Sequence, residues 1–349
     1  MAQASETQKM PKQGRPRLNA LKTLGNYSFI LIFLCIFLTY LIINRDAITR
    51  NGVMNILRHS TIVGVIAFGM GLVIITGGID LSVGSMLAII GGFSVEVFNA
   101  SNSPVLTLLF ALAMGLALGF LNGILVGKVK MPAFIVTLAT MMIFRSMAQY
   151  YLRAYVRKSI FNMNGQLSTY NAFYGFGQAK LLEVPVAGLV LIGVTIIMVF
   201  ITTSTKYGKS VYALGSNERA AQLAGVNVPW TRCTVYVVTG ILCGLAAFMQ
   251  LAMNGSVDPA TMGKSNEMYA IAAVVIGGVS MSGGRGKLLG VLFGAMSYTT
   301  IDKIIARLRL DALINDTIKG TILLIAVLIQ IIVPAIRGRV IKKKGFERS

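Results

Sequence analysis

The chain has 349 residues, of which 55% are hydrophobic and 13% are charged, and 32 Lys and Arg against 12 Asp and Glu give a formal net charge of +20. Soluble domains carry about 25% charged residues, so too little polar surface remains for a basic nucleic-acid-binding face on a water-soluble fold. The hydrophobic content also excludes intrinsic disorder. A polytopic membrane protein fits both the hydrophobic fraction and the charge.

Ten apolar segments predict transmembrane helices, because only helices or closed barrels satisfy their backbone in lipid and the alternation of barrel strands is missing. The first segment follows a basic tail over residues 1–26 and has no small-residue cleavage site, so we interpret it as a retained signal anchor. The sequence thus predicts an all-α membrane domain over residues 27–336 and a basic tail over 337–349. The ten segments are Tyr27–Ile43, Thr61–Thr76, Val83–Val97, Val105–Gly127, Ala133–Leu152, Val186–Ile201, Cys233–Met253, Met268–Ser280, Leu288–Ile301 and Thr317–Ile336.

The distribution of basic residues predicts the orientation. With ten spans both termini share one side, which carries 19 Lys and Arg, while the other side carries 11 and two more lie within spans. The richer side is cytoplasmic by the positive-inside rule. We therefore expect cytoplasmic termini and a cytoplasmic loop over residues 203–232.

Metal binding and disulfide bonding find little support in the sequence. Cys35, Cys233 and Cys243 lie in apolar runs without a Cys-x-x-Cys pair, and His59 is the single histidine. A zinc or iron site needs several such ligands together, so we expect no metal or cofactor. A disulfide between Cys233 and Cys243 stays open, although buried free thiols fit the apolar surroundings better.

Two pairs of spans are short and are separated by glycine-rich turns. A helix over Thr61–Thr76 is about 24 Å long, less than a hydrocarbon core of about 30 Å, and Met268–Ser280 is shorter still. Such breaks in matching halves point to a membrane-embedded site or hinge, and ordinary tight hairpins are the alternative. The residues expected at the translocation pathway or its gate are Gly77, Gly78, Asp80, Ser82, Gly84, Gly283 and Gly284.

Charged residues within spans require a cavity or a partner, since each costs about 2.5–3.5 kcal/mol at mid-membrane. We expect a structural or gating role for Asp80 beside the pathway. Arg145 is expected to snorkel outward, and Glu96 and Lys319 are expected near the outer interface.

Glycines at positions 115, 119, 123 and 127 repeat every four residues along one span. Small residues at this spacing let helix backbones approach closely. The repeat predicts tight packing inside the bundle, with a dimer seam as the alternative.

Nucleotide-binding motifs are absent from the sequence. Gly208-Lys209-Ser210 and Gly263-Lys264-Ser265 match the end of a Walker A loop, but Thr203 and Asp258 stand where its first glycine is required. No Gly-x-Gly-x-x-Gly loop occurs either. We therefore expect a transport subunit that is not an enzyme and has no nucleotide site of its own.

The cytoplasmic loop predicts a short helix, with Asn217 as its N-cap, then Glu218, Ala220 and Ala221, and Gly225 as its end. A helix of this kind can lie in another protein's groove. A plain connecting helix on the membrane surface is the alternative.

This loop resembles the coupling loop of monosaccharide-importing ABC transporter permeases of the ribose type, through Asn217-Glu218-Arg219-Ala220-Ala221 and Gly225-Val226-Asn227-Val228. The run from Gly77 to Ser85, residues 133–138 and 270–278, and the turn at Ser282–Gly286 are similar to the family too, in one order from about residue 53 to 333.

The resemblance implies a permease in the cytoplasmic (inner) membrane of a prokaryote, in contact with lipid and with no nucleic-acid partner. It pairs with a second copy or a sister permease, and a separate ATPase, commonly two cassettes in one polypeptide, binds ATP. A sugar-binding protein delivers ribose or a related pentose or hexose from outside. On this basis Glu218 to Gly225 form the coupling helix. The alternatives are a proton-coupled secondary sugar transporter, with Asp80 or Glu96 carrying the proton, and a passive channel.

Overall fold

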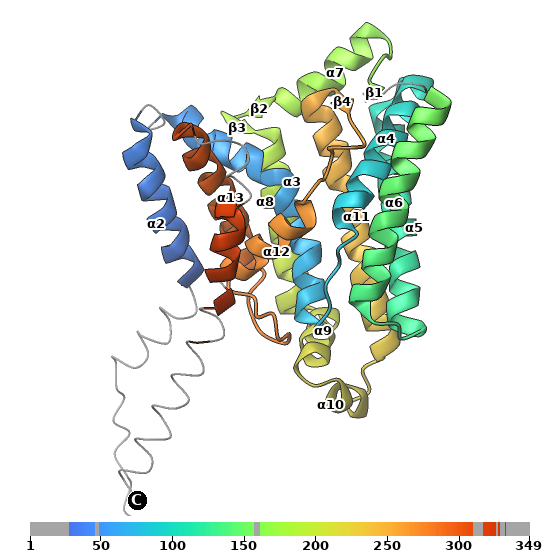
Figure 1. Ribbon diagram of the computed structural model, residues 1–349, viewed down its shortest axis with the longest axis vertical. Coiled ribbons are helices and arrows are strands. Elements are labelled where there is room, and N and C mark those ends of the chain that lie inside the picture. The colour runs from blue at the N-terminus through green and yellow to red at the C-terminus, as the bar shows by residue number, and fades with distance from the viewer. Residues whose placement is uncertain are drawn as a thin grey trace, which may run out of the picture.

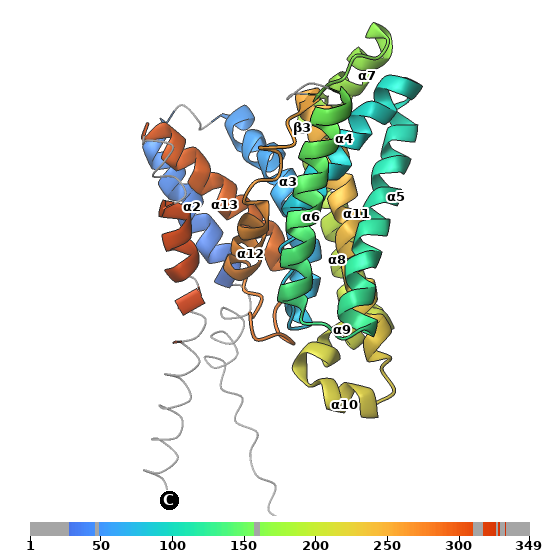
Figure 2. The same cartoon turned by 45° about the vertical axis from the view of Figure 1, so that its right-hand side comes forward.

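A computed structural model describes residues 28–45, 49–156, 161–309, 317–325, 327–328 and 332. Its long helices run up and down between two ends of the molecule (Figures 1 and 2). These helices are α2 (Ser28–Ile43), α3 (Arg50–Ile75), α4 (Val83–Ser101), α5 (Pro104–Gly123) with the π-helix η2 (Ile124–Lys128), α6 (Ala133–Val156), α8 (Val186–Ser204), α11 (Val228–Asn254), α12 (Asn266–Ile276) and α13 (Leu289–Arg307).

Seven helices in the described part of the chain are long and apolar enough to cross a membrane, so the chain is a multi-pass membrane protein. The first and eighth predicted spans correspond to the shorter apolar helices α2 and α12. Residues 317–325 of the tenth span are helical, and the rest of that span is largely outside the described residues. The tails 1–26 and 337–349 lie outside them as well, so the placement of the termini stays a prediction.

Local sequence signals explain where several helices begin. The Thr49 side chain accepts a hydrogen bond from the Gly52 N–H at the start of α3, and Ser103 accepts from the Leu106 N–H at the start of α5. Asn227 caps α11 in the same way. Each cap satisfies one of the N–H groups that a helix leaves without an internal partner.

The prediction of a short second span was wrong. Helix α3 has 26 residues, about 39 Å, and it continues through the polar positions Arg58 and Ser60. The Arg58 guanidinium donates to the Gln178 side chain, and the Ser60 hydroxyl donates to the Ile56 carbonyl at 2.7 Å. These partners let polar residues stay helical where hydropathy alone suggested an end. Only α12, with 11 residues, is as short as expected.

The repeated glycines of α5 and η2 pack against α11 of the same chain. A Cβ on Gly115 would meet the Gly240 carbonyl, and one on Gly119 would meet the Tyr236 carbonyl. The sulfur of Cys233 lies 3.0 Å from the Cβ position of Gly123. The repeat therefore serves packing inside the bundle, as predicted. Cys233 and Cys243 are free, buried thiols, which also confirms the preferred interpretation.

One end of the molecule is covered by α7 (Leu167–Gln178), β1 (Phe161–Asn162), β4 (Ser256–Val257) and the hairpin β2 (Lys180–Leu181) with β3 (Val184–Pro185). Strands β1 and β4 are antiparallel, with Phe161 opposite Val257. Helix α7, which the sequence analysis did not predict, buries Phe173 against Phe98 and Phe248 at ring distances of 5.3 and 4.9 Å.

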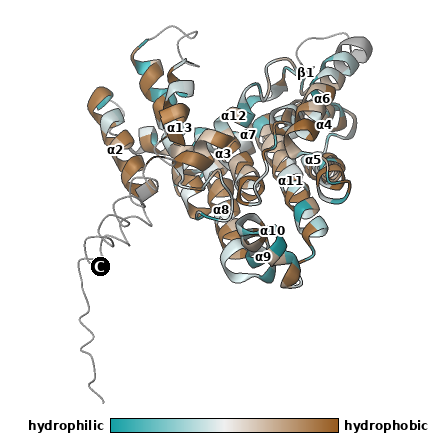
Figure 3. Cartoon of the chain, turned by 60° about the horizontal axis from the view of Figure 1, so that its bottom comes forward, coloured by the Kyte–Doolittle hydropathy of each residue, from teal (hydrophilic) through white to brown (hydrophobic). Residues whose placement is uncertain are grey.

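The opposite end carries α9 (Lys206–Ser216) and α10 (Glu218–Leu223), together with the turns after α3, η2 and α12 (Figures 1 and 3). Its described connecting segments contain eight Lys and Arg, at positions 128, 130, 206, 209, 219, 232, 285 and 287. The sequence predicts the loop over residues 203–232 to be cytoplasmic, from a count that includes both basic tails, and we call this the cytoplasmic end on that prediction. The predicted loop at 203–232 is therefore mostly helical and lies at this end.

Candidate functional site

Two glycine turns at the cytoplasmic end share one backbone motif. After α3, Gly77 has a φ of +82° and the Gly78 N–H donates to the Val73 carbonyl at 3.0 Å. After α12, Gly278 has a φ of +81° and the Val279 N–H donates to the carbonyl five residues back at 3.2 Å. Both are Schellman motifs, which end a helix with a left-handed residue that is best supplied by glycine. The predicted turn after α3 therefore has a counterpart of matching geometry after α12, but at Gly278 and not at the predicted glycines 283 and 284, because α12 ends at Ile276 and not at Ser280.

The segment between α3 and α4 is held by a buried polar cluster. Asp80 is fully buried, and its Oδ1 accepts hydrogen bonds from the Ser82 N–H at 2.9 Å and the Ser82 hydroxyl at 2.6 Å. The Asn122 side chain of α5 donates to the Ser82 oxygen at 2.9 Å. The Thr137 hydroxyl of α6 donates to the Ile79 carbonyl at 3.2 Å. These bonds fix the irregular backbone segment and connect it to α5 and α6.

A second irregular segment, residues 258–265, leads from β4 to α12 and meets the first one. A Cβ on Gly84 would meet the Gly263 carbonyl, and a Cβ on Gly263 would meet the Gly84 carbonyl. Only two glycines permit this approach of backbones. Arg145 of α6 lies at the same point, thirteen residues into a 24-residue helix, so it is about 18 Å from either helix end. We call this meeting point the mid-membrane crossing.

The expectation that Arg145 snorkels outward was wrong. Its Nη1 donates to the carbonyls of Pro259 at 2.9 Å and Met262 at 2.6 Å, and its Nη2 donates to the Gly84 carbonyl at 3.2 Å. The guanidinium offers five donors in a rigid fork, so one side chain bonds two carbonyls of residues 258–265 and one carbonyl in the first turn of α4. Arg145 points inward because non-helical backbone at membrane depth needs donors that lipid does not supply.

Helix α10 forms where the sequence predicted it. The Asn217 side chain accepts from the Ala220 N–H at 3.0 Å, and Gly225 has a φ of +83° in a third Schellman motif. Ala221 is buried, and Glu218 forms an ion pair with Arg232 at 2.8 Å. Leu223, which the prediction did not single out, is 90% exposed.

Helix α9 connects α10 to both glycine turns through backbone contacts. A Cβ on Gly215 would collide with the Ile75 carbonyl and would lie 2.7 Å from the Gly284 nitrogen. The Gly284 N–H donates to the Ile75 carbonyl at 2.8 Å, so the loop after α12 is bonded to the end of α3 under α9. The Tyr212 hydroxyl donates to the Gly286 carbonyl at 2.8 Å, and burial raises the pKa of Tyr212, which keeps this donor protonated. We use the name cytoplasmic junction for the five residues Ile75, Tyr212, Gly215, Gly284 and Gly286.

The predicted site residues therefore form three groups. Gly77, Gly78, Gly283 and Gly284 belong to the turns at the cytoplasmic junction, and Asp80 and Ser82 belong to the buried polar cluster. Gly84 belongs to the mid-membrane crossing. Sequence reasoning missed Gly215 and Arg145, because their roles depend on contacts between segments far apart in the chain. The pair Asp258-Pro259 was the one signal that the segment before α12 is not helical.

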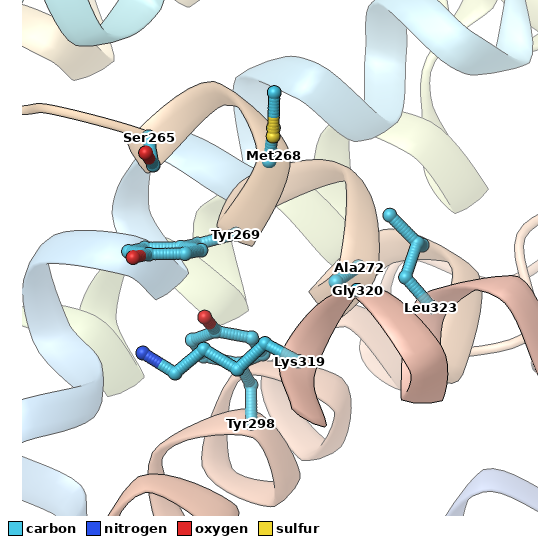
Figure 4. A pocket seen from close by; sticks show the side chains of 8 residues that line it. All are labelled: Ser265, Met268, Tyr269, Ala272, Tyr298, Lys319, Gly320 and Leu323. Atoms are coloured by element: carbon cyan, nitrogen blue, oxygen red, sulfur yellow. The ribbon is translucent and has the colours of Figure 1, made fainter. Parts of the chain in front are cut away.

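A cavity of about 290 Å³ lies between α12, α13 and the helical residues 317–325 (Figure 4). The ring centroids of Tyr269 and Tyr298 are 5.0 Å apart, and the Lys319 ammonium lies 4.5 Å from the centroid of the Tyr269 ring. Lys319 also forms an ion pair with Asp302 at 2.6 Å. The charge of Lys319 is thus compensated within the protein. The cavity lining is Ser265, Met268, Tyr269, Ala272, Tyr298, Lys319, Gly320 and Leu323.

Comparison with known proteins identifies the family. The chain is 36% identical to the ribose import permease protein RbsC of Bacillus subtilis, over 83% of this chain and 87% of that protein. It is 31% identical to the xylose transport system permease protein XylH of Haemophilus influenzae, over 86% and 95% of the two chains. It is 34% identical to the fructose import permease protein FrcC of Rhizobium meliloti, over 79% and 76%.

No solved structure matches the chain. The sequence profile described as branched-chain amino acid transport system / permease component matches residues 52–328, which include both glycine turns, the mid-membrane crossing and α10. The chain therefore belongs to this family of transport-system permeases.

Proposed function

We propose that the chain is the membrane-spanning permease subunit of an ABC importer that carries a monosaccharide, ribose or a related pentose or hexose, across the cytoplasmic membrane. A separate ATPase subunit hydrolyses ATP, commonly through two cassettes in one polypeptide. A sugar-binding protein delivers the substrate from outside, and the pore forms with a second copy or a sister permease. Relatives named as ribose, xylose and fructose permeases support the substrate class.

The cytoplasmic junction is the observation that supports this function best. Helix α10 presents Leu223, 90% exposed, to the cytoplasm, as expected of a helix that docks in a groove of another protein. Its neighbour α9 touches the end of α3 and the loop that follows α12 at once, through Gly215. A push on α10 by an ATPase therefore reaches the end of α3 directly and reaches α12 through the loop that contains Gly284.

The glycine turns and the mid-membrane crossing together describe a path for this movement. Displacement of the turn at Gly77 pulls on the irregular segment that leads to Gly84. Displacement of the turn at Gly278 moves α12 and the segment before it, which contains Gly263. Both segments end at Arg145, so we propose that this residue keeps them together while the pathway opens first outward and then inward.

The cavity in Figure 4 supports a neutral sugar as substrate. Tyrosine rings offer apolar faces for the C–H groups of a sugar, and their hydroxyls and the Lys319 ammonium offer hydrogen-bonding groups for its hydroxyls. Because Lys319 is paired with Asp302, the cavity does not call for a charged ligand.

Reconstitution tests the proposal directly. The chain is placed in vesicles with a candidate ATPase and a candidate binding protein, and uptake of labelled ribose, xylose and fructose is measured with ATP or with a proton gradient. We expect uptake that needs both ATP and the binding protein. Uptake driven by the proton gradient alone would instead support a secondary transporter.

The docking role of α10 has its own test. Leu223→Asp should abolish co-purification of the ATPase subunit while the permease still inserts in the membrane. Leu181→Asp is the matched control, because Leu181 is 62% exposed at the opposite end of the molecule. Equal co-purification of both variants would contradict the docking role.

A further inference from the structure

A polar cavity of about 240 Å³ lies at the cytoplasmic end of the molecule, between the first glycine turn, the turn from η2 to α6, and the first turns of α11. Gly77, Pro132 and Tyr236 contribute to its wall. Two cationic side chains, Lys130 and Arg232, line it as well, and no acidic residue does. Arg232 also pairs with Glu218 outside the cavity at 2.8 Å, but the lining itself has two cations and no carboxylate, which suits an anion.

Neighbouring residues place this cavity at the depth of lipid headgroups. Trp230 is 44% exposed, and the Lys128 ammonium lies 4.0 Å from the centroid of its ring. Tryptophan and basic residues mark the membrane–water interface. The first turn of α6, directly after the cavity, exposes Phe134 and Ile135 at 54% and 55%, which gives an apolar surface for acyl chains.

The charge of the surface around the cavity also favours the binding of an anion at this end. Its described connecting segments carry eight basic residues, and Glu218 is the acidic residue that faces them from α10. The cytoplasmic leaflet with its anionic lipids is the negative surface that this end meets.

We propose that the cavity binds the phosphate headgroup of an anionic phospholipid of the cytoplasmic leaflet. Lys130 and Arg232 hold the phosphate, and the acyl chains lie along Phe134 and Ile135. Arg232 is also the partner of Glu218, at 2.8 Å. The headgroup and the carboxylate at the start of α10 therefore share one guanidinium, so lipid binding weakens the attachment of α10 to α11.

Trp230 provides the test, because it is the single tryptophan of the chain. The full chain is placed in vesicles that contain phosphatidylcholine and phosphatidylglycerol in equal amounts, with bromine near the headgroup on one lipid or the other. We expect stronger quenching of Trp230 fluorescence by the brominated phosphatidylglycerol. Lys130→Gln should lower the relative binding constant for phosphatidylglycerol about fivefold, since one basic residue near an anionic surface has about this effect.

Three controls make the outcome decisive. Lys130→Arg should retain the preference, and Lys209→Gln, which removes the same charge from an exposed position outside the cavity, should leave it unchanged. An equal loss in the Lys209 and Lys130 variants would overturn the proposal in favour of a diffuse surface charge. Loss of the preference on adding soluble glycerol phosphate would also overturn it, and would assign the cavity to a free phosphate ligand.

The effect of the lipid on α10 is measured separately. This second part rests on the proposed function, whereas the binding of the lipid to the cavity does not depend on it. In the assembled importer, phosphatidylglycerol should change the ATP hydrolysed per sugar imported, and Lys130→Gln should remove this change. A normal quenching preference with no effect on this ratio would retain the lipid site and refute its link to α10.

Discussion

The cytoplasmic junction and the mid-membrane crossing are both places where two backbone segments touch through glycine, but their carbonyls are satisfied differently. At the junction, the backbone N–H of Gly284 bonds the last carbonyl of α3. At the crossing, the side chain of Arg145 bonds three carbonyls, those of Pro259 and Met262 in the irregular segment and that of Gly84 in α4. The junction thus depends on shape, whereas the crossing depends on one charged side chain.

The largest effect is expected at the crossing. Arg145→Leu leaves the carbonyls of Pro259 and Met262 without a donor inside the membrane, at about 1–3 kcal/mol each, so we expect the free energy of unfolding to fall by about 2–6 kcal/mol. Thermal unfolding in lipid nanodiscs measures this loss. Arg145→Lys keeps the charge without the fork and should recover part of it. A Leu variant as stable as the original chain would show that the guanidinium is not needed there.

The stability of the junction should depend on the volume of the side chain at Gly215 and not on charge. Gly215→Ala puts a methyl group against the Ile75 carbonyl, and we expect about 1–3 kcal/mol of destabilisation together with loss of ATP-driven uptake. Gly193→Ala in α8 is the control, because nothing lies within 4 Å of its Cβ position. Equal uptake by the two variants would mean that α9 does not need this close contact.

A smaller effect is expected at the start of α10. Asn217→Ala removes the N-cap and should destabilise this six-residue helix by about 1 kcal/mol, without altering the junction. Hydrogen exchange of α10 amides measures it, and Asn217→Asp should restore protection. Unchanged exchange in the Ala variant would argue that contacts with α9 alone hold α10.

The smallest effect on stability is expected at Glu218, whose side chain is 53% exposed in its pair with Arg232. Glu218→Gln should lower the free energy of unfolding by about 0.2–1 kcal/mol in low salt and by nothing measurable in high salt. The free energy of unfolding, measured at two ionic strengths, shows whether the loss is screened by salt. A salt-independent loss would indicate a packing role for the side chain.

Local signals predicted much of this molecule. Hydropathy found the membrane helices, and Asn217 and Gly225 defined α10 because caps and left-handed glycines act within a few residues of chain. Gly77 was predictable for the same reason, because a left-handed glycine ends α3. The polar face of α3 misled the prediction, because its partner Gln178 is 120 residues away.

The contacts that join the parts of the site could not be predicted from such local signals. Gly215 lies in an ordinary-looking stretch of α9, and nothing near it in sequence indicates that Ile75 and Gly284 pack against it. Arg145 looked like a residue free to reach the interface, because the carbonyls that it bonds belong to α4 and to residues 258–265. Long-range packing decides both positions.

The glycine contacts between α5 and α11 have a mechanical consequence. Two helices whose backbones touch over several turns cannot slide or bend independently, so they behave as one stiff lever that stands on the base of α11 next to α10. Helix α11 has 27 residues and is about 40 Å long, so a tilt of about 5° at its base moves its far end by about 3.5 Å. A small movement where the ATPase would push is thereby enlarged at the outer face, under α7 and β4.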